Sequence, residues 1–329
     1  MPRVLITTVP FGDKDLAPIE KLEAAGIDYV INPIGRKLTE SELAHLIPGF
    51  DVLIAGTEHI SKFVLSKADK LKFISRVGVG LDSLDLLTAK KQNIQVSYTS
   101  DAPAPAVAEL TIGLIFSLLR SIHVANQQMH QGEWKRHFGR RISDVTIGII
   151  GAGRIGGKVL NHLAGFNGAK VLIHDINPNI QLPHSALFSK ATLEEIYTKC
   201  DLITLHIPLS PVNRNMIKLE QLMQMKPGSH LINTSRGGIV NESDLVKALK
   251  MKHIGSAAID VFEEEPYSGP LTSIESCLLT SHMGSMSYDC RARMEIEATE
   301  EAIRFLNGQD LQNLVPISEY QLQEAMSLL

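Results

Sequence analysis

The hydrophobic pattern of the first hundred residues alternates short apolar runs with segments of helical spacing. Segments with apolar residues at helical spacing, such as residues 16–25 and 40–46, lie between the runs. Strands that alternate with helices in this way predict a parallel, doubly wound sheet. The predicted strands are residues 4–8, 29–32, 51–55, 73–77 and 94–98.

The same alternation starts again at Val145, after an almost wholly apolar helix predicted over residues 107–119. A last amphipathic helix is predicted over about residues 289–306. We therefore expect an α/β protein of two doubly wound parallel-sheet domains with a cleft between them. The first comprises residues 1–101, completed by 287–329, and the second residues 102–286. The strands predicted for the second are residues 145–150, 169–174, 202–206, 230–233, 257–260 and 277–280.

Composition narrows the classes of partner. The chain has 329 residues, 44% of them hydrophobic, which suffices for two ordinary cores. Lys and Arg number 32 against 36 for Asp and Glu, so no basic excess exists to bind nucleic acid. The longest apolar stretch, residues 110–119, is too short to cross a bilayer, which argues against a membrane partner.

Cysteine usage and the N-terminal segment bear on location. The three cysteines have spacings that match no metal motif, so we expect no metal site and a reducing compartment. Met1 leads directly into the first predicted strand, without the charged and apolar regions of a signal peptide. These features predict a cytoplasmic protein.

A glycine pattern follows the first strand of the second domain. Gly151-Ala-Gly-Arg-Ile-Gly156 follows that strand and precedes a helix that we expect from Lys158. The first Gly permits a tight turn, the second permits close approach of a pyrophosphate, and the third permits helix and strand to pack closely. The phosphates then lie at a helix N-terminus, which favours anions. The pattern predicts a dinucleotide site formed by Gly151, Gly153, Arg154, Ile155 and Gly156.

An acidic residue marks the end of the next predicted strand. Asp175 lies 19 residues after Gly156. A carboxylate at this position accepts hydrogen bonds from the ribose hydroxyls and repels a 2′-phosphate. The cofactor predicted from this residue is NAD rather than NADP.

Three further strands each end next to a polar residue: Arg236, Glu265 and His282. Taken singly, they are better explained as a surface charge, part of a solvated acidic loop and an ordinary histidine. Together they match the needs of hydride transfer to a keto acid. A guanidinium binds the carboxylate, and a histidine that titrates near neutrality donates a proton to the carbonyl oxygen. A neighbouring carboxylate would keep that histidine protonated and orient its ring.

The first domain contributes a glycine-rich loop after a strand. Its residues Arg76, Val77, Gly78 and Val79 are candidates for substrate binding, because successive amides can form an anion nest for the substrate carboxylate. The alternative is an ordinary turn from strand to helix.

The order of these motifs resembles the D-isomer-specific 2-hydroxy-acid dehydrogenases, within them the phosphoglycerate dehydrogenase-like branch. The resemblance is densest between Arg76 and Gly284. It rests on the motifs Gly78-Val-Gly-Leu-Asp82, Val107-Ala-Glu-Leu-Thr111, Gly132-Glu-Trp134, the glycine pattern, His206-Ile-Pro-Leu209, Asn233-Thr-Ser-Arg-Gly-Gly238, Asp260-Val-Phe-Glu-Glu-Glu-Pro266 and Ser281-His-Met-Gly284.

The resemblance implies a flavodoxin-like substrate domain, a Rossmann NAD domain and an NAD-dependent oxidoreductase acting on a small carboxylate, a D-2-hydroxy acid or its 2-keto acid. It implies that Arg236 binds substrate, that Glu265 is the carboxylate partner and that His282 is the acid/base. It also implies a homodimer formed through the NAD domain, with an arm around Trp134. The cofactor-binding residues that it implies, besides the glycine loop and Asp175, are His206, Pro208, Thr234, Ser235, Asp260 and Gly284, with Asp260 holding the nicotinamide amide.

One departure leaves the substrate open. Gly56 falls where phosphoglycerate dehydrogenases carry an Arg that helps bind the phosphate, although Arg76 and Arg136 match other phosphate-binding positions. Candidate substrates are 3-phosphoglycerate, hydroxypyruvate or glyoxylate, and D-lactate-like acids. Two alternatives stay open: an NAD-binding corepressor with little turnover, since such proteins keep the same Arg, Glu and His, and a formate-type dehydrogenase of the same fold.

Overall fold

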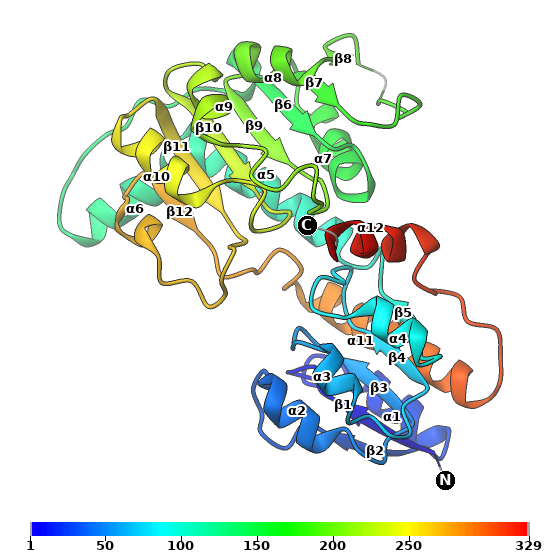
Figure 1. Ribbon diagram of the computed structural model, residues 1–329. Helices are drawn as coiled ribbons and strands as arrows, with labels where there is room; N and C mark the ends of the chain where they lie inside the picture. The colour runs from blue at the N-terminus through cyan, green and yellow to red at the C-terminus, as the bar shows by residue number, and fades with distance from the viewer. Residues whose placement is uncertain (1, 184, 328–329) are drawn as a thin grey trace. The chain divides into compact units, whose positions relative to one another are not determined.

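A computed structural model describes residues 2–183 and 185–327 of the chain. The chain divides into two compact units (Figure 1). Unit 1 comprises Met1–Pro103 and Met286–Leu329, and unit 2 comprises Ala104–Ser285. Both ends of the sequence therefore contribute to unit 1, while unit 2 is continuous.

Unit 1 is built on five parallel strands in the order β2-β1-β3-β4-β5. This is the order of flavodoxin-like sheets, so the predicted fold of the first domain is confirmed. Successive parallel strands require crossover connections, which the helices between them supply. The strands are β1 Arg3–Ile6, β2 Asp28–Ile31, β3 Val52–Ala55, β4 Phe73–Arg76 and β5 Gln95–Tyr98.

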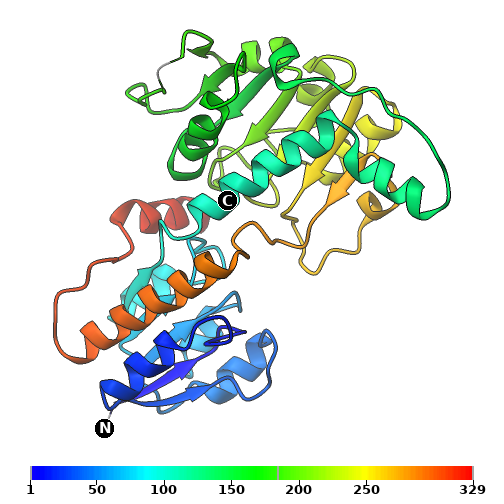
Figure 2. The same ribbon diagram turned by 180° about the vertical axis from the view of Figure 1, so that it is seen from behind.

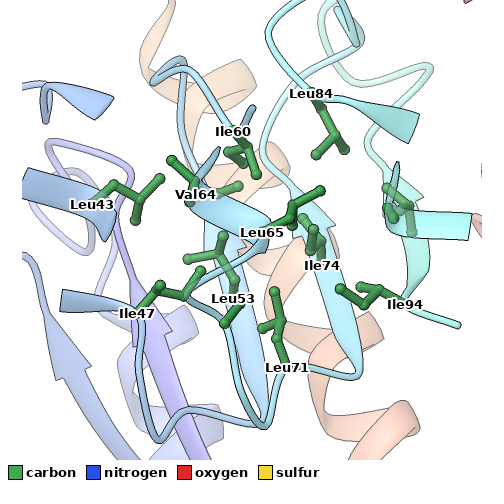
Figure 3. Packing of buried hydrophobic residues seen from close by; sticks show 14 of the residues in the cluster. Leu43, Ile47, Leu53, Ile60, Val64, Leu65, Leu71, Ile74, Leu84 and Ile94 are labelled. Atoms are coloured by element: carbon green, nitrogen blue, oxygen red, sulfur yellow. The ribbon is translucent and has the colours of Figure 1, made fainter. Parts of the chain in front are cut away.

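Helices cover both faces of this sheet. On one face, apolar side chains from α2 (Glu40–Leu46), α3 (Lys62–Leu65) and α4 (Leu86–Lys91) pack against the strands, and Figure 3 shows Leu43, Ile47, Val64 and Ile74 meeting there. On the other face, α1 (Ala17–Ala24) lies beside α11 (Tyr288–Leu306), which comes from the second segment of unit 1 (Figure 2). The rings of Phe73 and Phe305 stack there with centroids 4.7 Å apart. A last helix, α12 (Ile317–Ser327), contacts α4.

Unit 2 is built on seven parallel strands in the order β12-β11-β10-β9-β6-β7-β8. The direction of winding reverses between β6 and β9, as in Rossmann folds, so the predicted fold of the second domain is also confirmed. The strands are β6 Thr146–Ile150, β7 Lys170–His174, β8 Phe188–Lys190, β9 Leu202–Leu205, β10 Ser229–Asn233, β11 Ile254–Ile259 and β12 Cys277–Leu279.

Two layers of helices enclose the unit 2 sheet. The apolar helix α5 packs against α7 and against β10 and β11, and its buried side chains join one core. Side chains of α8, α9 and α10 form a second core. The helices are α5 Ala104–Leu119, α6 Ile122–His130, α7 Arg154–Ala164, α8 Leu193–Lys199, α9 Leu219–Gln224 and α10 Glu242–Lys250, with 3-10 turns at Ile142–Asp144 and Pro270–Ser273.

Some element boundaries differ from prediction. The helix after the glycine pattern begins at Arg154 rather than Lys158, because Gly156 and Gly157 lie inside its first turn. Helix α5 begins at Ala104 and includes Pro105, since proline is tolerated where the first helical amides have no partner. Strand β8 was not predicted, because three residues with one buried side chain give no readable periodicity.

In residues 2–183 and 185–327, no single helix is both long and apolar enough to span a membrane. Only α5 and α6 taken together pass that test by length and composition, and the pair is bent by 67°.

Candidate active site

The predicted catalytic and cofactor residues of unit 2 lie in loops that follow the carboxyl ends of its strands, or in the first turn of α7. Because these strands are all parallel, their carboxyl ends meet at one edge of the sheet. Ligands of open parallel sheets bind beyond this edge, near the reversal of strand order. Asp175, His206, Asp260 and His282 each follow a strand by one to three residues.

Two of the three glycines in the pattern are required by the protein itself. Gly151 has a φ of 92°, and a Cβ placed on it would lie 2.4 Å from the carbonyl oxygen of His206. A Cβ on Gly156 would lie 2.0 Å from the carbonyl oxygen of Gly151. These approaches make the tight turn and the close packing of helix against strand that the pattern predicts.

The middle glycine has a different environment. A Cβ on Gly153 would meet no described protein atom within 4 Å, so packing of the folded chain does not require glycine there. Gly153 precedes α7, whose first amides receive no side-chain cap. Space beside a helix N-terminus with uncapped amides fits the pyrophosphate of a dinucleotide.

Asp175 lies against this same loop. Its Oδ2 accepts a hydrogen bond of 2.7 Å from the amide of Ala152, and its Oδ1 accepts one of 2.7 Å from the amide of Asn177. These bonds fix a carboxylate beside the glycine turn, where the ribose of a bound dinucleotide is expected. The residues present therefore fit NAD.

The loop after β9 forms a second wall of this region, because the backbone of His206 approaches Gly151. The Nε2 of His206 lies 3.0 Å from the hydroxyl of Thr204. Burial lowers the pKa of His206 to about 3, so its imidazole is neutral at physiological pH. His206 therefore contributes shape rather than positive charge. Pro208, two residues further along, is exposed, and its carbonyl accepts a hydrogen bond from Asn213.

The loop that carries Arg236 is shaped by Asn233, a residue that sequence reasoning did not single out. The buried Oδ1 of Asn233 accepts hydrogen bonds from the amide and hydroxyl of Ser235, and its Nδ2 donates to the carbonyl of Arg236 at 2.8 Å. The Nη1 of Arg236 donates to the carbonyl of Ser235 at 2.7 Å. The hydroxyl of Thr234 lies 3.0 Å from that of Thr111 on α5. Asn233 thus turns the chain tightly at the end of β10.

Gly237 brings the Arg236 loop against the acidic loop. A Cβ on Gly237 would lie 2.0 Å from the carbonyl oxygen of Phe262, so only glycine permits this approach. The Gly237-Gly238 pair was visible in the sequence, but its partner segment lies about 25 residues away along the chain. Only tertiary structure shows that the loops after β10 and β11 are in contact.

Glu265 and His282 form a pair. The Nδ1 of His282 lies 2.8 Å from Oε2 and 3.1 Å from Oε1 of Glu265. The side chains are 48% and 33% exposed, so solvent and ligands can reach both. The amide of Phe262 donates to Oε1 of Glu265 at 3.1 Å, which fixes the carboxylate. With Nδ1 facing Glu265, Nε2 is the ring nitrogen left for a substrate.

Asp260 anchors the loop on which His282 lies. Its side chain is buried, and Oδ1 accepts hydrogen bonds from the hydroxyl of Thr280 at 2.6 Å and the amide of Met283 at 2.9 Å. Oδ2 accepts from the amide of Gly284 at 3.0 Å, and the amide of His282 donates to the carbonyl of Asp260 at 2.8 Å. This anchoring was not foreseen. The role of Asp260 toward the nicotinamide stays a prediction.

The glycine-rich loop of unit 1 is more self-contained than the predicted anion nest. The amide of Val77 donates to the carbonyl of Ala55 at 2.9 Å, and that of Gly78 donates to the hydroxyl of Thr99 at 2.7 Å. The buried guanidinium of Arg76 bonds the carbonyl of Val77 and lies against Gly78. Two of the expected nest amides are thus engaged within unit 1. A carboxylate at this loop would need later amides, beginning with that of Val79.

Comparison with known proteins gives a consistent picture. The family model described as "D-isomer specific 2-hydroxyacid dehydrogenase, NAD binding domain" matches residues 112–284. The hydroxypyruvate reductase of Thermotoga maritima is 32% identical over 277 residues, which cover 82% of this chain and 89% of the relative. The D-3-phosphoglycerate dehydrogenase of Methanocaldococcus jannaschii is 36% identical over 286 residues, covering 84% of this chain and 54% of the relative. The chain thus spans about half the length of that relative.

Solved structures share the fold over nearly the whole chain. The TT0316 protein of Thermus thermophilus has a TM-score of 0.87 and 31% identity, covering 95% of this chain and all of that one. The NAD-dependent formate dehydrogenase of Staphylococcus aureus, solved in complex with NAD, has a TM-score of 0.83 and 29% identity. It covers 96% of this chain and 99% of its own.

Proposed function

Because the chain belongs to the D-isomer specific 2-hydroxyacid dehydrogenase family, we propose that it interconverts a D-2-hydroxy acid and the corresponding 2-keto acid with NAD as cofactor. The observation that carries this proposal is the Glu265–His282 pair, at 2.8 Å, in the same unit as the dinucleotide loop. An exposed histidine with a fixed carboxylate on Nδ1 is suited to move a proton at a carbonyl oxygen.

NAD would be held by the glycine loop and the first amides of α7, with Asp175 on the ribose. When bound, the reduced cofactor supplies the hydride that reaches C2 of the keto acid. We further propose that the loops after the strands line the nicotinamide half of this site. Their residues are His206, Pro208, Thr234, Ser235, Asp260 and Gly284.

The proton follows a defined route in this proposal. His282 in its protonated form donates from Nε2 to the carbonyl oxygen, while Glu265 accepts a hydrogen bond at Nδ1 and stabilises the imidazolium. In the oxidative direction the neutral ring takes the hydroxyl proton through the same nitrogen. Asp260 acts as a positioning residue, since it fixes the backbone on both sides of His282.

Arg236 is the proposed partner of the substrate carboxylate. A guanidinium binds a carboxylate through two parallel hydrogen bonds, which also fixes the orientation of C2. The unit 1 loop of Arg76, Val77, Gly78 and Val79 is proposed to contribute to the same substrate. Because the amides of Val77 and Gly78 are engaged within unit 1, that contribution rests on Val79 and the shape of the loop.

A panel assay tests the function. Purified protein is mixed with NADH and, separately, glyoxylate, hydroxypyruvate, phosphohydroxypyruvate and pyruvate, and NADH consumption is followed. We expect turnover on at least one of these acids, with the D-isomer as product wherever the product has a stereocentre at C2. Tight NADH binding without turnover on any acid would favour the corepressor alternative. Oxidation of formate with NAD in the absence of keto-acid reduction would favour the formate-type alternative.

A homodimer formed through unit 2 is a second part of the proposal. The helix α6 and the segment after it expose large apolar side chains, with Trp134 78% exposed and Phe138 fully exposed. Exposed large apolar side chains at this density along the chain are the residue type that subunit contacts cover. We expect a dimer by light scattering and a monomer for the double variant Trp134→Glu, Phe138→Glu. A monomeric wild type would contradict this part alone.

We also propose a cytoplasmic location. It is supported by the free, buried thiols of Cys200, Cys277 and Cys290, which suit a reducing compartment. Burial raises the pKa of each of these thiols, to about 12 for Cys200 and Cys277, so they are poor nucleophiles. The test is fractionation of cells of the native host. Recovery of the protein outside the soluble cell content would contradict this location.

A further inference from the structure

The sheet of unit 1 has its own reversal of strand order, between β1 and β3. In flavodoxin-like sheets, ligands bind beyond the carboxyl ends of the strands at this reversal. Two loops flank it here: residues 7–12 after β1 and residues 56–58 after β3. Side chains in these two loops are therefore expected to affect how unit 1 recognises part of a substrate.

A buried carboxylate joins the two loops. Glu58 is 1% exposed, and its Oε1 accepts hydrogen bonds from the hydroxyl of Thr7 and, at 2.9 Å, from the amide of Gly56. Thr7 is also 1% exposed. The hydroxyl of Thr7 and the amide of Gly56, at the edge of the sheet, thus both donate to the carboxylate of Glu58.

The space at Gly56 is closed by the neighbouring loop. A Cβ on Gly56 would lie 2.8 Å from the Cα of Thr8 and 2.7 Å from Oε2 of Glu58. Backbone at that distance cannot give way cheaply, so no larger side chain fits on this backbone. An arginine at this position, which would bring a positive charge to the edge, is therefore excluded.

A cation on α11 that contacts the first of these loops is already matched by a carboxylate. The Nε of Arg291 donates to Oε1 of Glu295 at 2.5 Å, and its Nη2 donates to the hydroxyl of Thr8 at 2.7 Å and to the carbonyl of Pro10 at 2.5 Å. The other oxygen of Glu295 accepts from the amide of Gly12 at 2.8 Å. Arg291 therefore holds the first loop in place, and Glu295 compensates its charge.

We propose that Glu58 is a specificity-determining residue, which makes the chain select 2-keto acids with an uncharged substituent over those with a phosphate or a second carboxylate. This inference rests on the proposed function and names its substrate class. At this edge Glu58 engages two donors and adds a negative charge, which opposes a second anionic group on the substrate. Charges separated by protein rather than water repel more strongly.

Two substitutions separate the charge of Glu58 from its shape. Glu58→Gln removes the charge, while its amide oxygen can still accept from the hydroxyl of Thr7 and the amide of Gly56, which both bond Oε1 of Glu58. Glu58→Asp keeps the charge with a shorter side chain. The matched control is Asp28→Asn, which removes one carboxylate from the opposite, amino end of the same sheet, where Asp28 pairs with Arg3 on the surface.

The first measurement is kcat/KM for hydroxypyruvate and for its 3-phosphate, which differ only in the phosphate. We expect wild type to prefer hydroxypyruvate by about tenfold or more, since a like charge opposed to the ligand costs at least that factor. Glu58→Gln should reduce this preference about tenfold. Glu58→Asp and Asp28→Asn should retain it. If Glu58 acted only by holding the two loops together, Glu58→Asp would change the ratio of the two kcat/KM values as much as Glu58→Gln.

The second measurement does not depend on turnover. Calorimetry gives the dissociation constants of D-glycerate and 3-phospho-D-glycerate in the presence of NADH, where no reaction occurs. The wild type should bind D-glycerate more tightly, and Glu58→Gln should narrow the difference. Equal or better binding of the phosphorylated acid by wild type, an unchanged ratio in Glu58→Gln, or binding of neither acid overturns the inference. A shifted binding ratio without any keto-acid turnover would instead reject the proposed function and leave the inference standing.

Discussion

The two sheets present different kinds of chemistry at their carboxyl edges. In unit 2, the edge carries ionisable groups that solvent reaches, with His282 48% and Glu265 33% exposed. In unit 1, the corresponding edge carries Glu58 and Thr7, each 1% exposed and bonded to one another. Both sheets use parallel strands to gather loops at one place.

The difference indicates a division of labour between the units. Half-exposed, ionisable side chains can exchange protons and contact a ligand, whereas buried groups with matched partners can only fix shape and local charge. Under the two proposals above, the reaction depends on unit 2 and selection of the substrate substituent depends on Glu58 in unit 1. Substitutions at the two edges should therefore impair different steps.

Removing the imidazole should have the largest effect. His282→Ala should lower kcat for keto-acid reduction by about 10²–10⁴-fold, because proton donation in the transition state is lost. The dissociation constant of NADH should change little, since the glycine loop is intact. The control is His162→Ala, which removes an exposed histidine from α7 of the same unit. A drop of less than threefold in His282→Ala would remove this residue from the mechanism.

The glycines of the dinucleotide loop should separate folding from binding. Gly156→Ala should destabilise unit 2 by about 2–3 kcal/mol, because its Cβ would lie 2.0 Å from the carbonyl oxygen of Gly151. Gly153→Ala should leave the melting temperature nearly unchanged and weaken NADH binding by roughly tenfold to a hundredfold, since the methyl group would meet only the ligand. Equal NADH affinity in wild type and Gly153→Ala would show that no pyrophosphate approaches there.

The acid beside the glycine loop should set the choice of cofactor. Wild type is expected to prefer NADH over NADPH, and Asp175→Asn should narrow that preference by about tenfold, because the repulsion of a 2′-phosphate is removed. The asparagine keeps an oxygen that accepts the hydrogen bond from the amide of Ala152. The ratio of kcat/KM for the two cofactors measures the effect. Equal use of both by wild type would exclude Asp175 as the ribose acid.

Acid should weaken unit 2 through two half-buried histidines. Burial lowers the pKa of His206 to about 3 and of His230 to about 4, against about 6.5 in an unfolded chain. Below pH 6.5 the unfolded state binds more protons than the folded state. Lowering the pH from about 6.5 to about 4 therefore lowers the free energy of unfolding, by up to about 1.4 kcal/mol per pH unit for each histidine.

His230→Gln should make that dependence shallower, since the amide does not titrate and still bonds the hydroxyl of Ser256. Urea unfolding followed at pH 7 and at pH 5 gives the dependence. The same slope in the variant as in wild type would show that His230 does not contribute.

The strands and the glycine turn could be predicted from the sequence because they depend on local patterns. The predicted runs fall within a few residues of the observed strands, and Gly151 and Gly156 follow β6 as their spacing indicates. The polar residues that follow the strands could also be predicted, because the end of a strand can be recognised from the local sequence. The short strand β8 was missed because it has too few residues to show a period.

Contacts between segments far apart in the sequence could not be predicted. That Asp260 bonds the amides of Met283 and Gly284, and that Gly237 meets Phe262, depends on neighbouring strands in the folded sheet. The bond from the amide of Gly78 to Thr99 likewise joins two loops and reduces the predicted anion nest. Glu58 gave no signal, since an acidic residue after a strand reads as a solvated loop.

The most direct test of the division of labour is the pH profile of Glu265→Gln, with kcat/KM for keto-acid reduction measured across the alkaline limb. We predict that activity at low pH is largely kept while the alkaline limb moves to lower pH, because Glu265→Gln removes the carboxylate that lies 2.8 Å from Nδ1 of His282. An alkaline limb at the same pH in wild type and Glu265→Gln would contradict the account, since the pair would then have no part in proton transfer.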